Sequence, residues 1–108
     1  MSDDPEELDP EQAALAMTEE YPDSPLPWFS LGRHYLSAGA PAKAAEALRR
    51  CVALQPDYAA ALFALGEACA AAGLGEEARD AFQRCRRAAL AQNHPSLAEE
   101  AEQRQRDL

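Results

Sequence analysis

The sequence contains almost no β-branched residues. It has no isoleucine, and Val52 and Thr18 are its only valine and threonine. Aromatic residues make up only 6% of the chain. Because strands favour β-branched and aromatic side chains, this composition argues against a substantial β-sheet. The abundant residues are alanine, leucine, glutamate, glutamine and arginine, which favour helices. We therefore expect an all-α fold, and 108 residues are enough for one domain.

The sequence also lacks the residue patterns of catalytic and metal sites. Its three cysteines, Cys51, Cys69 and Cys85, have no CxxC spacing, which argues against a disulfide framework or a zinc site. All three fall on inward-facing helical stripes, so we expect buried free thiols. His34 and His94 have no Cys, Asp or Glu partner at ligand spacing. No nucleophile has a plausible base and orienting acid, and there is no phosphate-binding loop. We therefore expect no enzyme activity, no cofactor and no metal.

Basic residues are missing from the N-terminal part of the chain. The first 24 residues hold nine of the 19 acids and no lysine or arginine, whereas the remainder holds ten residues of each sign. We therefore predict an acidic, disordered arm at 1–9 ahead of a neutral body. Its charge argues against nucleic acid or an anionic membrane as partner. The arm either stays solvated or contacts a basic cluster on the body, and the sequence leaves both open. That cluster is Arg49, Arg50, Arg84, Arg86 and Arg87.

Long apolar runs are absent as well. The N-terminus has no basic segment followed by an apolar one, which argues against a secretory signal. The most apolar stretch, 58–75, is rich in alanine and interrupted by Glu67, so it predicts a buried helix and not a membrane span. With free thiols, these features predict a cytoplasmic protein.

The chain repeats itself with a period of 34 residues. Residues 25–58 align with 59–92 without a gap, and nine positions are identical, including a phenylalanine, two glycines and a cysteine. Pro22-Asp23 precedes Pro56-Asp57 by the same 34 residues. A degenerate half-repeat therefore precedes two full repeats.

Caps and stop signals predict six helices joined by short turns. We expect N-caps at Asp9 (with Gln12 in a capping box), Ser24, Asp57 and Ser96 (with Glu99). Gly39 and Gly73 are expected to end helices, and nothing ends the fifth helix before Asn93. The predicted segments are a half-repeat or capping helix at 10–24, repeats at 25–58 and 59–92, and a C-terminal capping helix at 93–108.

One run of residues resembles a known family. The pattern Trp28-x2-Leu31-Gly32-x2-Tyr35-x8-Ala44-x3-Leu48-x2-Cys51-x4-Pro56 is similar to the tetratricopeptide-repeat signature. The second repeat matches at Leu62, Leu65, Gly66, Ala78, Phe82 and Cys85, but Cys69 replaces the usual tyrosine and the final proline is missing. The resemblance implies a right-handed α-α superhelix that acts as an interaction scaffold.

The resemblance also implies a site. The first helix of each repeat in this family lines a concave groove that binds a partner peptide or helix. The matching positions are Leu26, Phe29, Arg33 and Leu36 in the first repeat and Ala60, Phe63, Glu67 and Ala70 in the second. The periodicity agrees, because Trp28, Leu31 and Tyr35 form the core stripe of the first helix of repeat 25–58, whereas Phe29 and Leu36 lie on a different face. Such a face either binds a ligand or packs on neighbouring helices.

Two further expectations concern charge and assembly. Arg33 and Glu67 occupy equivalent positions, so we predict a mutual surface ion pair. The basic and asparagine-containing clamp with which some family members hold chaperone C-termini is absent. The main alternative to an adaptor is a structural role, in which the apolar surface or the helical ends, with Leu97 and Leu108, join copies into a homo-oligomer.

Overall fold

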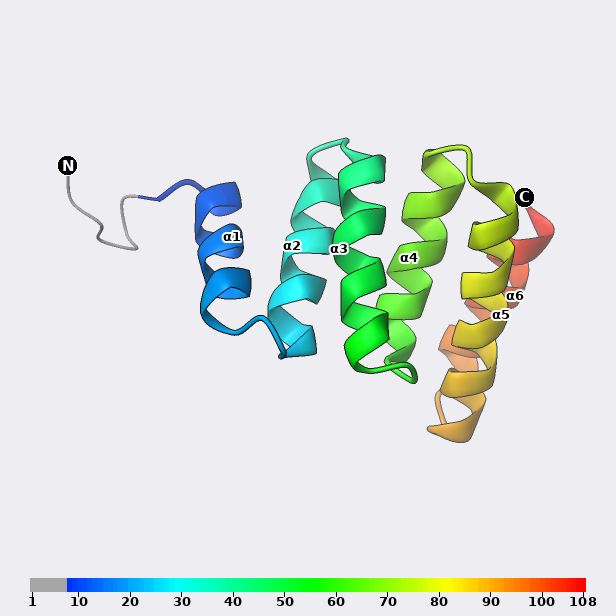
Figure 1. The fold of residues 1–108 in the computed structure, drawn as a ribbon. Coiled ribbons are helices and arrows are strands. Elements are labelled where there is room, and N and C mark those ends of the chain that lie inside the picture. The colour runs from blue at the N-terminus through cyan, green and yellow to red at the C-terminus, as the bar shows by residue number, and fades with distance from the viewer. Residues whose placement is uncertain (1–7) are drawn as a thin grey trace.

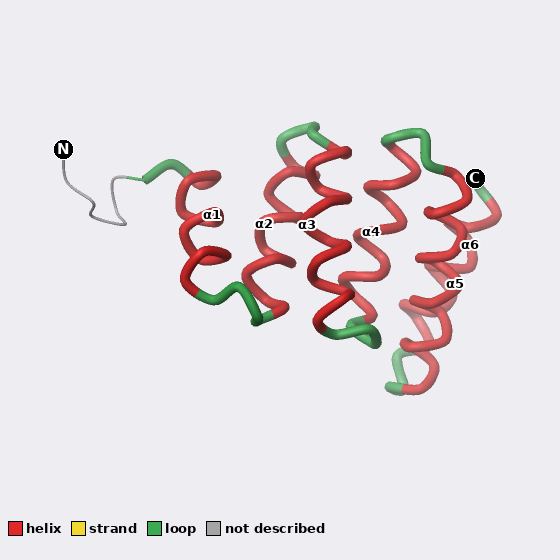
Figure 2. Tube along the Cα trace, in the orientation of Figure 1, coloured by secondary structure: helices red, strands yellow, loops and turns green. Residues whose placement is uncertain are grey.

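The computed structural model describes residues 8–108, and these form six helices connected by short turns (Figures 1 and 2). No strand occurs within the described range, so the all-α fold is confirmed. The body is elongated, measuring 49 × 27 × 20 Å. The helices are α1 (Pro10–Glu20), α2 (Pro25–Ser37), α3 (Pro41–Leu54), α4 (Ala59–Ala71), α5 (Gly75–Ala91) and α6 (Pro95–Arg106).

The helices pack as a series of neighbours, which is how a solenoid is built. Each helix contacts the next one along the chain, and α2 also contacts α4. Gly39 and Gly73 adopt φ values of 75° and 80° after α2 and α4, so these two turns need the left-handed conformation that glycine tolerates. The predicted helix ends at both glycines are confirmed.

The register of the half-repeat is also preserved. The Tyr21 amide donates to the Met17 carbonyl at 2.9 Å, and the Gln55 amide donates to the Cys51 carbonyl at 3.0 Å. A second backbone hydrogen bond of 3.2 Å closes each turn. The Ser24 amide donates to the Tyr21 carbonyl in the first, and the Tyr58 amide donates to the Gln55 carbonyl in the second. α1 therefore precedes α2 as α3 precedes α4, which is the arrangement expected of the second helix of a half-repeat.

Close helix contacts occur at two equivalent glycines. A Cβ atom at Gly32 would lie 2.5 Å from Leu48 Cγ, and one at Gly66 would lie 2.6 Å from Phe82 Cε1. Both Leu48 and Phe82 are almost completely buried. The missing side chains therefore let α2 approach α3, and α4 approach α5, with large apolar groups filling the gaps.

The predicted caps are only partly correct. Asp9 and Gln12 form the predicted capping box at 2.8 and 3.2 Å. Ser24 is the N-cap of α2 but makes no side-chain capping bond. The N-caps predicted at Asp57 and Ser96 are wrong, because Tyr58 and His94 hold the N-cap positions of α4 and α6.

The start of α6 differs for a local reason. α5 continues to Ala91, and Asn93 then takes a φ of 66°, as the glycines do after α2 and α4. Pro95 suits the first helical position because its fixed φ is helical and it has no amide hydrogen to satisfy. Ser96 therefore lies inside the helix, whereas the expected stop at Asn93 is confirmed.

Two remaining predictions concern the arm and the membrane. Most of the predicted arm at 1–9 lies outside the described residues, and its contact with the basic cluster stays a prediction. Three arginines of that cluster form ion pairs within the body: Arg49 with Glu77, Arg84 with Asp80 and Arg86 with Glu102. Among residues 8–108, no helix combines the length and apolar character that crossing a bilayer requires.

Candidate partner-binding surface

The eight predicted groove residues all keep access to solvent. We call them together the α2–α4 surface. Leu26, Arg33, Ala60 and Ala70 are exposed, and Phe29, Leu36, Phe63 and Glu67 are half-buried. The other faces of the same helices are buried, including Leu31 on α2 and Leu62 on α4. α2 and α4 therefore each have a core face and a second, partly apolar face.

In the first repeat, the apolar part of this surface packs against a neighbouring aromatic ring. The rings of Phe29 and Tyr58 are 5.1 Å apart at their centroids. Leu36 packs against the core while remaining half-buried. These side chains therefore pack on neighbouring helices while keeping some solvent access, and ligand binding by this face stays a prediction.

Two residues expected in the core stripe of α2 are only half-buried. The Trp28 indole donates to the Pro22 carbonyl at 2.9 Å, and the Arg50 guanidinium lies 5.8 Å from its ring. The Tyr35 hydroxyl donates to Glu11 at 3.0 Å. Burial and the nearby carboxylate raise the pKa of Tyr35. The Tyr35 bond joins α2 to α1, and the Trp28 bond joins α2 to the turn that follows α1.

In the second repeat, a cation from α6 covers the surface. Phe63 packs edge-on against Phe82 with centroids 5.5 Å apart. The Arg104 guanidinium lies 5.4 Å from the Phe63 centroid and donates to Glu67 at 3.2 Å. The predicted Arg33–Glu67 pair is therefore wrong, because α6 brings Arg104 to Glu67 and Arg33 remains exposed.

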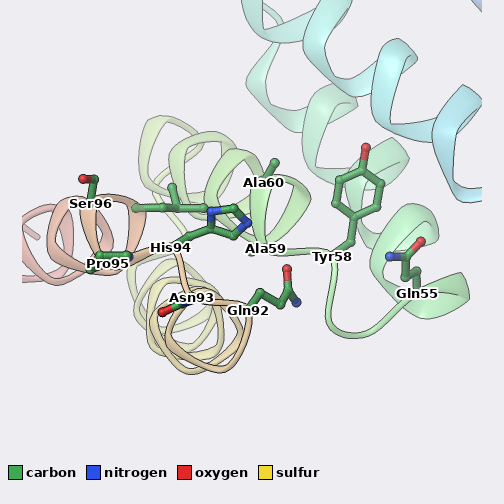
Figure 3. A pocket seen from close by; sticks show the side chains of 10 residues that line it. Gln55, Tyr58, Ala59, Ala60, Gln92, Asn93, His94, Pro95 and Ser96 are labelled. Atoms are coloured by element: carbon green, nitrogen blue, oxygen red, sulfur yellow. The ribbon is translucent and has the colours of Figure 1, made fainter.

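A pocket of about 540 Å³ borders the α2–α4 surface at the N-terminal end of α4. Figure 3 shows the Tyr58 ring on one side of it and Pro95 and Ser96 on the other. Ala60 and Leu97 contribute apolar lining. Gln92 closes the base by donating from Nε2 to the Asp57 carbonyl at 2.6 Å. The surface thus extends from α2 across α4 to α6.

Sequence reasoning missed the contribution of α6. Arg104, Leu97 and His94 lie on or beside the surface, yet the helix was expected only as a capping helix or as a contact between copies. The signal was weak because the α5–α6 connection departs from the 34-residue register. No repeat alignment could therefore assign these positions.

Leu26 lies at the other end of the surface, where it meets α1. It is 58% exposed. It lines a separate pocket of about 380 Å³ between α1 and α2. The remaining lining residues are Ala14, Met17, Tyr21, Ser24, Pro27 and Ser30. We call this pocket the α1–α2 groove.

The thiols are placed for packing. Cys51, Cys69 and Cys85 are fully buried free cysteines, as predicted. Burial raises the pKa of each to about 11. Because the thiolate is the reactive form, these groups are poor nucleophiles at neutral pH. Among residues 8–108, no three His, Cys, Asp or Glu side chains are grouped so that they could hold a metal ion.

Comparisons with known proteins agree with this geometry. A family model described as "tetratricopeptide repeat" matches residues 6–57 and 29–95. The solution structure of a protein from Bordetella parapertussis superposes with a TM-score of 0.76 at 24% identity. That match covers 93% of this chain and 87% of the other, and it shows a shared fold. No curated protein matches the sequence.

Proposed function

The chain belongs to the tetratricopeptide-repeat family, and we propose that it is an adaptor that binds a partner peptide or helix on the α2–α4 surface. Repeats of this family generally mediate protein–protein interaction. The proposed adaptor acts by binding, with no catalytic step of its own, and its place of action is the cytoplasm.

One observation carries this proposal. α2 and α4 are apolar on two faces, and the face bearing Phe29, Leu36 and Phe63 is only half-buried. An apolar face that the fold leaves partly uncovered is a preferred place for a partner to bury side chains. Arg33 and the Glu67–Arg104 pair border it, so a partner can also be oriented by charge.

A homo-oligomer joined through the C-terminal end is less well supported. After Pro95, every exposed residue of α6 is polar: Ser96, Glu99, Glu100, Gln103 and Arg106. Leu97 packs against the core, which leaves Leu108 as the exposed leucine in the segment after Pro95. A polar end is what a terminal cap of a solenoid needs to remain in water.

The test uses substitutions that place larger side chains on the surface without removing side chains that pack in the core. Removing Phe29 or Phe63 would also remove contacts with Tyr58 or Phe82. Ala60 and Ala70 are exposed, so Ala60→Glu/Ala70→Glu adds bulk and charge while leaving the core intact. Loss of a captured partner from this variant supports the α2–α4 surface, and unchanged capture contradicts it.

A further inference from the structure

The N-terminal end of the solenoid exposes a face that the repeat normally buries. α1 precedes α2 as α3 precedes α4, with matching turn hydrogen bonds. Besides contacting α4, α3 packs against the preceding helix α2, and Leu48 lies against Gly32 at this contact. No helix of residues 8–108 occupies the corresponding position beside α1.

The equivalent residues differ in exposure as this relationship predicts. Met17 is 46% exposed, whereas its equivalent Cys51 is fully buried. Ala14 is half-buried, whereas its equivalent Leu48 is fully buried. The face that α3 turns toward its own partner helix is therefore open on α1.

The α2 side of the groove shows the same difference at one position. Ser30 is exposed, whereas its equivalent Ala64 is fully buried on α4, which contacts α2. Leu26 is exposed like its equivalent Ala60, and Pro27 is buried like its equivalent Ala61. The face of α1 and the Ser30 position of α2 are thus open where a full repeat buries the equivalent residues.

The charge around the α1–α2 groove favours one class of partner over the others. Glu20 and Asp23 are exposed on either side of Tyr21 along the chain. No lysine or arginine occurs before Arg33. A second copy docking by the same end would bring like charges together, which costs affinity. α6 of another copy also fits poorly, because its exposed positions after Pro95 are polar.

We propose that the α1–α2 groove binds a basic amphipathic helix of a protein partner, seated where the repeat would place another helix. Its apolar stripe covers Met17, Tyr21 and Leu26, and its lysine or arginine residues face Glu20 and Asp23. This surface is separate from the one formed by α2 and α4, although Leu26 lies at their junction. Leu26 is the residue that they share, so substitutions at Met17 and at Ala60 and Ala70 test the two sites separately.

The experiment titrates a labelled peptide against the full chain by fluorescence polarisation. The probe is a Leu/Ala/Lys amphipathic helix of about 18 residues, since isolated helices below about 12–15 residues are marginal in water. A peptide with glutamate in place of every lysine is the charge control. We expect the lysine peptide to bind at least about tenfold more tightly. Equal affinity for the two peptides would overturn the charge argument.

Two protein variants separate docking from simple attraction. Met17→Asp and Leu90→Asp each add one negative charge at an exposed apolar residue, but Leu90 lies on α5 outside the groove. If charge attraction alone held the lysine peptide, both variants would bind this peptide more tightly than wild type. Docking predicts that Met17→Asp weakens binding about tenfold or more while Leu90→Asp changes it less than about twofold. Equal effects of the two variants would overturn the proposal.

Amide chemical shifts of the wild-type chain give a readout that does not depend on variant folding. Peptide-induced shifts are expected on α1 and the first half of α2. Shifts concentrated on α4 and α6 would overturn the assignment of the groove. A wild-type dimer that Met17→Asp dissociates would identify a second copy as the occupant. Binding that tightens about tenfold on removal of residues 1–7 would identify this segment as the occupant.

Discussion

Phe82 packs directly on Gly66, with its Cε1 atom 2.6 Å from where a Cβ atom would lie. Leu48 has the same relationship to Gly32 one repeat earlier. The α2–α3 and α4–α5 contacts thus each depend on a missing side chain at a glycine. A backbone that must stay close cannot accept even a methyl group without displacing its neighbour.

The first prediction follows from this contact. Gly66→Ala and Gly32→Ala are each expected to lower the free energy of unfolding by about 1–3 kcal/mol, because overpacking exceeds the gain in helix propensity. Urea denaturation followed by circular dichroism measures this change. Gly75→Ala is the control, since no atom lies within 4 Å of its Cβ position. Equal behaviour of all three variants would contradict the packing account.

The second prediction concerns Arg104, which joins α6 to the rest of the body. Its contacts with Glu67 and the Phe63 ring are half-exposed, so Arg104→Ala should cost about 1 kcal/mol. Arg106→Ala is the matched control, because Arg106 forms only an exposed pair with Glu102 along the same helix. Hydrogen exchange of α6 should accelerate in the first variant and stay nearly unchanged in the second. The opposite order would show that Arg104 does not fasten the helix.

The sequence was sufficient to predict the repeats, and the reason is local. Gly39 and Gly73 are needed for the turns that follow α2 and α4, and Gly32 and Gly66 mark the close contacts. Each of these requirements names one residue type at one position. A period built on them is readable without knowing any distant contact.

The site was only partly predictable because it depends on where α6 lies. The eight positions on α2 and α4 come from the family resemblance, and periodicity adds that Phe29 and Leu36 lie on a second face; all eight keep solvent access. Arg104 replaced Arg33 as the partner of Glu67, since α6 begins at Pro95 after a longer α5. The exposed Met17 was missed for a related reason, because periodicity shows which residues share a face but not whether a helix covers it.

The third prediction concerns the three buried thiols. Their pKa values are raised to about 11, so the native state keeps them neutral after an unfolded chain has begun to ionise. Their contribution to stability is therefore complete below about pH 8.5 and is lost as the pH rises toward 11. Urea midpoints at several pH values measure this loss. The triple variant Cys51→Ala/Cys69→Ala/Cys85→Ala should show a shallower decline.

That decline should not vanish in the triple variant. Burial also raises the pKa of Tyr35 and Tyr58, and both act in the same direction at high pH. A second readout is direct, because the native thiols should resist a thiol reagent at pH 8 and react fully in urea. Rapid labelling of the folded protein would contradict the placement of the cysteines.

The fourth prediction concerns the ends of the solenoid. Because α6 is polar on its exposed face, we expect the chain to keep a monomer mass on dilution in sedimentation experiments. Leu108→Asp should leave that mass unchanged, although Leu108 is 43% exposed. A concentration-dependent mass that this substitution abolishes would favour the structural alternative over the adaptor.

The proposal that a partner binds to α2 and α4 is tested most directly by quantitative capture from native lysate. Wild type is compared with Ala60→Glu/Ala70→Glu and with Ala42→Glu/Ala53→Glu, which changes two exposed alanines of α3. Thermal melting first confirms that all three are folded. The adaptor account predicts that one captured protein is retained equally by wild type and by the α3 variant. The Ala60→Glu/Ala70→Glu variant should retain about tenfold less of that protein, or still less. Equal retention by all three would contradict it.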